Sequence, residues 1–332
     1  MRILIVSTQY PGYGGGATNS YSLIKKMRLD GFRCAGVFLE DVVKVDPEKI
    51  GGIFNDINDS AIIKYLGGKP THVFGKNYKA PYVGAKAFPE AKNIYLVSGC
   101  PHMMSVSKKG VSAIEYIASK KRVNFPAEAR TIKSADFVVP NSLLGKKLLE
   151  FNYGALRKIT KPINTSNITK NLTKVSWHRK RYDVCFCSSH FNRPVKNVKL
   201  AKEILSNKYL SRLKILIIGK NSVNFLRGEN IVNVDLSTHV EAKKLIGQSK
   251  VIINTSFYDA SPNVIREGIA LGSNILVSKN CGWSEKYPRI MVINNYRNIS
   301  EWLKKIKFLT SKKIENNYSD EFSSQNLLNI LK

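Results

Sequence analysis

Two carboxylates separated by seven residues are the strongest chemical signal in the sequence. Asp259 stands in a short polar loop, and Glu267 follows in a stretch with the apolar spacing of a helix. Val264 and Leu271 place Glu267 on the apolar side of that helix. A carboxylate there is costly unless hydrogen bonds satisfy it. We therefore expect both carboxylates to face a ligand crevice, with a plain ion pair between Glu267 and a lysine as the alternative.

The elements that would position these carboxylates follow the order strand, helix, strand. Residues 251–253 and 274–278 are apolar runs that predict buried strands. Between them, Ser261 suits a helix N-cap, Pro262 the first helical position, and Gly272 the helix end. The loop after the first strand would then lie at a carboxyl end, where open α/β sheets bind ligands.

Strands and helices alternate along the whole chain, which predicts parallel sheets. A length of 332 residues suits two domains of about 150 residues each. Further strands are predicted at residues 3–7, 34–39, 94–97, 136–140, 182–187 and 213–219, and further helices at residues 18–29, 197–205 and 241–248.

The stretch from Val251 to Glu285 resembles the donor-site signature of retaining glycosyltransferases of the GT-B fold, family 4. That signature has two acidic residues with seven between them, followed by small residues and an apolar strand. Here Asp259 stands in place of the usual first Glu, and Asn274 replaces the usual Pro. The resemblance implies two Rossmann-like, doubly wound domains facing across a cleft. It also implies transfer of a hexose from a nucleotide-sugar donor with retention of configuration.

The resemblance covers most of the chain. The opening strand, the glycine loop and the helix ending in LDGF are similar to the N-terminal domain of the family, and LKILIIGK is similar to its central C-terminal strand. It implies an acceptor-side domain over residues 1–160 and a donor domain over residues 180–310. Residues 311–332 would form a helix that crosses back to the first domain, and the apolar spacing from Phe322 to Leu331 permits this.

The resemblance also assigns roles at the donor site. Glu267 would hold the ribose hydroxyls of the donor. Asp259 would position the donor sugar and phosphates, together with the backbone N–H groups of Ser261, Asn263 and Val264. Retaining members of this fold lack a well-placed nucleophile, so we name no covalent residue.

Two cations follow the first strand of the second half. Arg193 offers a planar fork and Lys196 a point charge, a pair suited to a diphosphate. The resembled family neutralises its leaving diphosphate at this place, although Arg193 and Lys196 are closer together than in the common pattern. The alternative is two solvated cations in a very basic chain.

Gly15 and Gly16 lie between a predicted strand and a predicted helix. Backbone N–H groups and the helix dipole attract phosphate at such a place, and in the resembled family this loop approaches the donor pyrophosphate. A plain tight turn is the alternative reading. The spacing is not that of the dinucleotide-binding fingerprint.

His102 follows a predicted strand in a Cys-Pro-His loop. The resemblance implies that it lines the acceptor pocket and contacts the donor sugar, whereas a structural histidine is the alternative. No His and Cys set has the spacing of a metal site, and the sequence has no Asp-x-Asp motif. We therefore expect a metal-independent enzyme without a cofactor, whose substrate is a nucleotide sugar such as a UDP- or GDP-sugar.

Composition narrows the partners and the compartment. Five scattered cysteines predict reduced thiols and a cytoplasmic protein. No apolar run approaches the roughly 20 residues of a membrane span, and the apolar start of the chain reads as a strand rather than a signal peptide. A net charge of +29 favours anionic partners. These include the nucleotide sugar, an anionic acceptor glycan or lipid, and a membrane surface bound peripherally; nucleic acid is less favoured.

Two other functions remain open. A nucleotide-sugar epimerase on the same fold would need acid and base carboxylates in the first domain, for which Glu115 and Glu128 are candidates. A basic nucleic-acid-binding or DNA-modifying protein would use the clusters at residues 108–109 and 120–122. Neither cluster interleaves aromatic residues with its cations as single-strand binders do.

Overall fold

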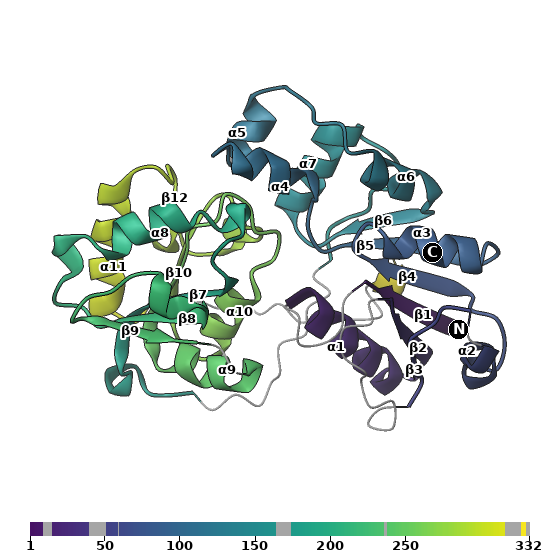
Figure 1. The fold of residues 1–332 in the computed structure, drawn as a ribbon, viewed down its shortest axis with the longest axis horizontal. Helices are drawn as coiled ribbons and strands as arrows, with labels where there is room; N and C mark the ends of the chain where they lie inside the picture. Colours follow the sequence, from purple (N-terminus) through teal and green to yellow (C-terminus); the bar gives the residue numbers. More distant parts are fainter. Residues whose placement is uncertain are drawn as a thin grey trace. The chain divides into compact units, whose positions relative to one another are not determined.

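The computed structural model describes residues 1–8, 15–39, 51–58, 60–163, 174–235, 238–315 and 327–329. The chain divides into two compact units, each with its own sheet (Figure 1). Unit 1 comprises Met1–His102, Arg122–Asn167 and Asp320–Lys332, and unit 2 comprises Met103–Lys121 and Ile168–Ser319.

Unit 1 is built on a six-stranded parallel sheet of order β3-β2-β1-β4-β5-β6. The strands are β1 (Arg2–Ser7), β2 (Arg33–Phe38), β3 (Ile53–Phe54), β4 (His72–Lys76), β5 (Lys92–Val97) and β6 (Phe137–Pro140). From β1 the chain moves outward to β2 and β3, then returns to build β4, β5 and β6 on the other side. This change of direction, between β1 and β4, marks the crevice where such sheets bind ligands.

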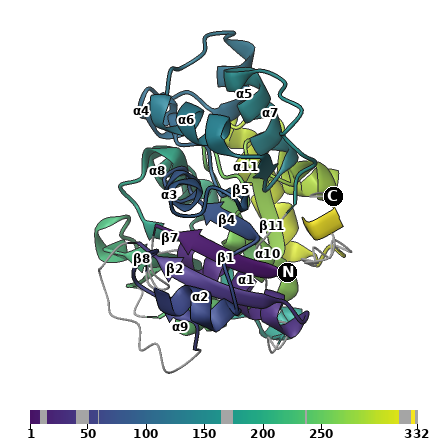
Figure 2. The same ribbon diagram turned by 90° about the vertical axis from the view of Figure 1, so that its right-hand side faces the viewer.

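Helices cover both faces of this sheet. Its strands β1 and β2 lie side by side in Figure 2. They are α1 (Gly15–Leu29), α2 (Ser60–Leu66), α3 (Ala80–Ala87), α6 (Pro126–Ser134) and α7 (Leu143–Tyr153). Because side chains alternate along a strand, Ile5 of β1 packs with Leu23 of α1, whereas Val6 packs on the other face with Ile62 of α2. The strands are therefore apolar on both faces, as the sequence led us to expect for a parallel sheet.

The last described residues of the chain belong to the core of unit 1. Leu327 and Leu328 are buried among the side chains on the α1 face of the sheet. The spacing that predicted a helix at residues 311–332 began at Phe322 and ended at Leu331, and both of these lie outside the described residues.

Unit 2 repeats the plan with a six-stranded parallel sheet of order β12-β11-β10-β7-β8-β9. Its strands are β7 (Tyr182–His190), β8 (Ile215–Lys220), β9 (Ile231–Val234), β10 (Ser249–Asn254), β11 (Asn274–Ser278) and β12 (Val292–Ile293). Its helices are α8 (Val198–Leu205), α9 (His239–Gly247), α10 (Asn263–Ala270) and α11 (Ile299–Ser311). Short 3-10 turns are η2 (Trp177–Arg179), η3 (Pro194–Lys196), η4 (Lys208–Leu210), η5 (Ser222–Asn224), η6 (Ser284–Lys286) and η7 (Arg289–Met291).

A segment from the first half of the chain packs with unit 2, although the sequence placed all of residues 1–160 in the first domain. It contains most of α4 (His102–Lys108) and all of α5 (Ala113–Ala118). The backbone N–H of Ala113 donates to the carbonyl oxygen of Phe257 over 2.8 Å, and that of Ile114 donates to Asn280 Oδ1 over 3.1 Å. These partners are more than 140 residues away in sequence, so no local pattern marks them.

Glu115 anchors this segment. Its carboxylate accepts from the Tyr296 hydroxyl at 2.8 Å and from Arg297 Nε at 3.0 Å, and it also completes the capping box of α5 with Ser112. Burial acts to raise the pKa of Glu115, but the hydrogen bonds from Ser112, Arg297 and Tyr296 outweigh it and lower the pKa to about 2. Glu115 is therefore an ionised structural contact.

Two further features bear on the expectations from composition. All five cysteines are free. Among the described residues, no helix combines the length and the apolar character that crossing a bilayer requires.

Candidate functional site

The structure brings two of the sequence-predicted residues into direct contact in unit 2. Strands β7 and β10 are parallel neighbours, so their carboxyl ends meet at one edge of the sheet. Lys196, in the turn after β7, places Nζ 2.6 Å from Oδ2 of Asp259, in the loop after β10. Asn254 Nδ2 lies 3.3 Å from the same oxygen. The two charged side chains are only 17% and 15% exposed, which makes this a largely buried, charge-assisted pair.

Backbone contacts between the two loops hold this pair in place. Phe257 N–H donates to the carbonyl oxygen of Val195 at 2.8 Å, and Thr255 Oγ1 donates to that of Lys196 at 3.2 Å. Two neighbouring carboxyl-end loops are thus joined to each other, so the geometry of the pair is fixed by the backbone rather than by flexible side chains alone.

Residues that follow β11 also hold Asp259 in place. Its backbone N–H donates to the carbonyl oxygen of Asn280 at 3.2 Å, and its own carbonyl accepts from Gly282 N–H at 2.7 Å. Asn280 additionally binds the start of α5. Neither Asn254 nor Asn280 could be assigned to this site from the sequence, because an isolated Asn in a loop carries no distinctive spacing.

Glu267 is buried on α10, where it is 6% exposed. Its Oε1 lies 4.0 Å from Nζ of Lys243 on α9, so the structure contains the lysine contact that the alternative reading required. A Cβ on the neighbouring Gly268 would lie 2.8 Å from the side chain of Ile252, which shows how closely α10 packs on β10. This close approach fixes the position of Glu267.

The charges of Glu267 and Lys196 both act on the thiol of Cys187 on β7. Burial raises the pKa of Cys187 to about 12, the Glu267 carboxylate adds to this rise, and Lys196 opposes it. Cys187 on β7 is thus close enough to Glu267 and to Lys196 for their opposite charges to act on it in opposite directions.

The start of α10 differs from the prediction. The helix begins at Asn263, with Pro262 at the N-cap and no side-chain cap, so Ser261 does not cap it as expected. Pro262 holds an extended ψ of 106°, which delays the helix by one residue. The amides at a helix start have no acceptor within the helix and suit an anion. Ser261, Asn263 and Val264 remain half-buried at this start.

Arg193 and Lys196 differ in how far they are exposed to solvent. It precedes η3 and is exposed, whereas Lys196 at the end of η3 is largely buried. Asn197 follows in a left-handed conformation, with φ of 48°, and turns the chain into α8. The short spacing between the two cations therefore places only Lys196 on Asp259.

Gly15 and Gly16 are the first residues of α1, in unit 1, rather than part of the preceding loop. The predicted helix began near Thr18, so the structure extends it toward the amino end. Gly14 lies outside the described residues.

His102 is completely buried at the start of α4, instead of lining a surface. Its Nδ1 lies 3.2 Å from Oε2 of Glu128, which is equally buried and accepts from the Tyr153 hydroxyl at 2.7 Å and from the Tyr95 hydroxyl at 3.1 Å. Burial and the Glu128 carboxylate raise the pKa of both tyrosines, which keeps them as donors. Glu128 thus holds His102 in an internal network.

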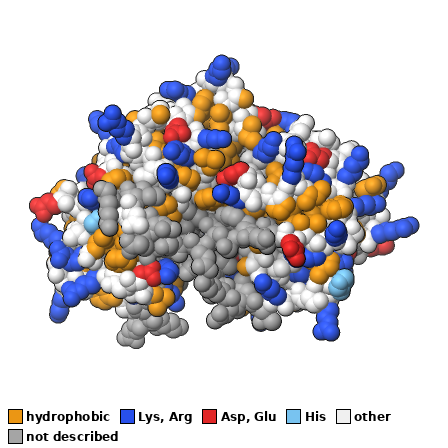
Figure 3. Space-filling view, turned by 180° about the vertical axis from the view of Figure 1, so that it is seen from behind, with side chains coloured by type: hydrophobic (Ala, Val, Ile, Leu, Met, Phe, Trp, Pro, Cys, Tyr) orange, Lys and Arg blue, Asp and Glu red, His pale blue; other side chains and the backbone are white. Residues whose placement is uncertain are grey.

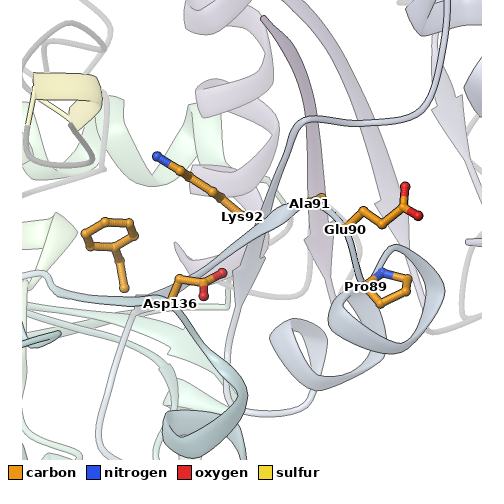
Figure 4. Close-up of a pocket in the computed structure, with 6 residues that line it drawn as sticks. Pro89, Glu90, Ala91, Lys92 and Asp136 are labelled. Atoms are coloured by element: carbon orange, nitrogen blue, oxygen red, sulfur yellow. The ribbon is translucent and has the colours of Figure 1, made fainter.

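No metal site emerges from the described residues, since no group of three or more His, Cys, Asp or Glu side chains is arranged to hold an ion. A pocket is present in unit 1 at the amino ends of β5 and β6, lined by Pro89, Glu90, Lys92 and Asp136 (Figure 4). Asp136 there accepts from the backbone N–H of Asn93 at 2.7 Å. This pocket lies at the edge opposite to the ligand-binding edge of such sheets.

Comparison with solved structures identifies the fold. The chain is similar to a sucrose-phosphate synthase from Thermosynechococcus elongatus, with a TM-score of 0.68 and 10% sequence identity over 94% of this chain and 90% of the other. It is also similar to the Anabaena protein HepE, solved in complex with UDP and glucose, with a TM-score of 0.61 and 14% identity over 94% and 93% of the two chains.

A third similar structure is the lipopolysaccharide outer core galactosyltransferase WaaB in its apo form, with a TM-score of 0.61 and 14% identity over 95% and 92% of the two chains. No family model and no curated protein matches the sequence. The two parallel six-stranded sheets, together with these neighbours, establish the GT-B fold that the sequence predicted.

Proposed function

We propose that the protein is a retaining glycosyltransferase that moves a hexose from a nucleotide sugar to a glycan or lipid acceptor without a metal ion. The observation that carries this proposal is the largely buried Lys196–Asp259 pair at the carboxyl edge of the unit 2 sheet, together with the buried Glu267 on α10. Neighbours with the same fold include glycosyltransferases, which supports the reaction class.

In this proposal the cations neutralise the diphosphate that leaves the sugar. Lys196 exchanges part of its contact with Asp259 for the diphosphate, and the exposed Arg193 adds its planar fork. Fixed charges aimed at the developing negative charge supply the largest share of such catalysis. Because backbone contacts hold Lys196, little reorganisation accompanies the reaction.

The other residues bind and orient the donor. Glu267 accepts hydrogen bonds from the ribose hydroxyls, while Asp259 positions the sugar and the amides at the start of α10 face the phosphates. Gly15 and Gly16 offer amides at the start of α1 in unit 1. Because His102 is buried, it positions the acceptor-side elements that pack around it instead of touching the acceptor. Glu128 fixes the orientation of its ring.

The two alternative functions have weaker support. Glu115 is held by Tyr296 and Arg297, and Glu128 by two tyrosines and His102, so neither carboxylate stands ready as the acid or base of an epimerase. On the one face that Figure 3 shows, the Lys and Arg side chains are scattered among other side chains and form no continuous strip.

Binding of a set of nucleotide sugars tests this proposal. HepE has been solved with UDP-glucose, which makes UDP-sugars the first choice. We expect one nucleotide sugar among UDP-glucose, UDP-galactose and GDP-mannose to raise the melting temperature in the presence of EDTA. Saturation at a hundred times Kd would add about 2.7 kcal/mol of stability. Thermal unfolding with and without EDTA is the measurement, and a shift that needs added Mg²⁺ would contradict metal independence.

Asp259→Glu tests the unusual first carboxylate. The longer arm keeps the charge but moves it relative to Lys196 and Asn254, so we expect affinity for UDP to fall only about two- to tenfold, or roughly 0.5–1.5 kcal/mol. Calorimetric titration of UDP measures this, and Asp259→Asn serves as the variant that removes the charge. Complete loss of binding in Asp259→Glu would mean that the site is built around the shorter arm.

A further inference from the structure

Lys76 is a buried cation at the carboxyl end of β4, and the proposed function does not use it. It is 2% exposed, and no described residue forms a hydrogen bond with its Nζ. It pairs in register with Ser7 of β1 and Leu96 of β5. It therefore stands beside the point between β1 and β4 where the strand order reverses.

The side chain of Lys76 lies on the α1 face of the sheet. A Cβ on Gly75 would lie 2.3 Å from backbone atoms of Pro81 in α3, so Gly75 faces α3. Phe74 and Lys76 alternate to the other face, where Phe74 packs with α1. On that face Ser20 of α1 donates to the hydroxyl of Ser7 at 3.2 Å, so α1 covers this end of β1.

No acidic side chain from the packed elements reaches Lys76. The sequences of β1, β4, β5 and α1 contain no Asp or Glu. Asp30, just past α1, pairs with Lys26 at 2.6 Å. The titratable and charged side chains on these elements, apart from Lys76, are Arg2, His72, Lys92, Tyr95, Tyr21, Lys25, Lys26 and Arg28.

Polar groups surround the strand ends next to Lys76. Asn77, in a left-handed conformation with φ of 68°, donates through Nδ2 to Thr8 Oγ1 at 3.0 Å and accepts from Ser98 Oγ at 2.6 Å. Asn141 Nδ2 donates to the carbonyl oxygen of Ser98 at 3.2 Å. The described ends of β1, β4, β5 and β6 thus form a polar edge, to which Lys76 contributes an ionisable amine.

We propose that Lys76 binds an anionic group, a carboxylate or a phosphate, on the sugar acceptor. This rests on the proposed function and on the acceptor-side role that the resemblance implies for residues 1–160, which include β4. Burying an amine that has no counter-ion among the described residues is costly, and an anion bound at this edge would supply one. A neutral acceptor would leave the amine unpaired.

Burial of the amine gives this site a proton signature. Desolvation lowers the pKa of Lys76 to about 7, so at pH 8 the amine is mostly neutral. An anion beside it favours the charged form and raises the pKa again. Binding at pH 8 must therefore take up a proton from the solvent, which a surface lysine, already charged at that pH, does not do.

The donor diphosphate is the rival source of the anion, since Gly15 and Gly16 open α1 in the same unit. The experiment therefore compares inorganic phosphate, glucuronate, glucose and UDP as separate probes. Each is titrated calorimetrically at pH 8 in two buffers of different ionisation enthalpy, which reports the protons taken up. Lys76→Met removes the amine at nearly constant volume, and Lys79→Met removes an exposed lysine three residues away.

We expect wild type to bind glucuronate at least tenfold more tightly than glucose and to take up close to one proton with glucuronate or phosphate. Lys76→Met should lose both the preference and the proton uptake but keep its UDP affinity, while Lys79→Met should behave as wild type. The wild-type proton uptake stands even if a variant misfolds.

Two outcomes would overturn the inference. Equal binding of glucuronate and glucose by wild type, or a preference that survives in Lys76→Met, would show that Lys76 does not hold the acceptor anion. A tenfold loss of UDP affinity in Lys76→Met would assign the amine to the donor instead. Failure of UDP to bind wild type would count against the proposed function, whereas the glucuronate and phosphate results would still decide the role of Lys76.

Discussion

Replacing Glu267 with alanine is expected to weaken UDP binding about 10- to 150-fold while the protein still unfolds cooperatively. In our proposal this carboxylate accepts hydrogen bonds from the donor ribose, and losing a charged hydrogen bond costs about 1.5–3 kcal/mol. Glu267 is 6% exposed on a helix that packs closely on β10, so its position does not depend on the ligand. Calorimetric titration of UDP, with thermal unfolding alongside, measures both quantities.

The contact of Glu267 with Lys243 supplies a matched control. Their charged atoms are 4.0 Å apart, which is long for a hydrogen bond, so we expect Lys243 to contribute little to the position of the carboxylate. Lys243→Met should retain most of the UDP affinity. If Glu267→Ala binds UDP as tightly as wild type and its only defect is lower stability, Glu267 is a structural partner of Lys243 and the donor site lies elsewhere.

Replacing Lys76 with methionine is expected to raise the free energy of unfolding at pH 7 by on the order of 2–4 kcal/mol. Burial lowers the pKa of Lys76 from 10.5 to about 7, with no described acidic partner to oppose it. The folded protein at pH 7 or below must either carry a buried charge or give up a proton that the unfolded chain keeps. Methionine fills a similar volume without either cost.

The pH dependence gives the sign of this effect. Between about pH 7 and pH 10.5 the unfolded chain binds a proton at Lys76 that the folded protein does not, so wild-type stability rises with pH across this window. The advantage of Lys76→Met should therefore be full below about pH 7 and disappear toward pH 10.5. Urea unfolding at a series of pH values measures it.

Lys79→Met provides the comparison for this stability series. Lys79 is exposed, so its loss should change stability little at any pH. A fall in stability in Lys76→Met would show that the amine stabilises the folded protein, and it would contradict the cost assigned here to burying it without an acidic partner among the described residues.

The sequence alone determined the plan of the molecule. Residues 251–253 lie within β10, residues 274–278 coincide with β11, and α10 begins within two residues of its prediction. These successes share a cause: long apolar runs bounded by Pro and Gly are local properties, and parallel strands buried on both faces leave a strong trace in sequence. The same runs place Asp259 and Lys196 after strands, where loops meet at one edge.

Tertiary structure alone decided which side chains meet. The 2.6 Å contact between Lys196 and Asp259 depends on β7 and β10 being neighbours, and strand order is not written in either loop. In the same way, His102 is withdrawn from the surface by Glu128, and Glu115 is held by Tyr296, 181 residues away.

The burial of Lys76 could not be predicted from the sequence by itself. The short strand β4 was not predicted, since a His, a Gly and a Lys interrupt its apolar run, and a lysine after such a run reads as a solvated end. The burial of Lys76 depends on the elements that pack against it, which are β1, β5 and α1. A local pattern can therefore fix the fold and the edge at which ligands bind, whereas the desolvation and pairing of each charge follow only from long-range packing.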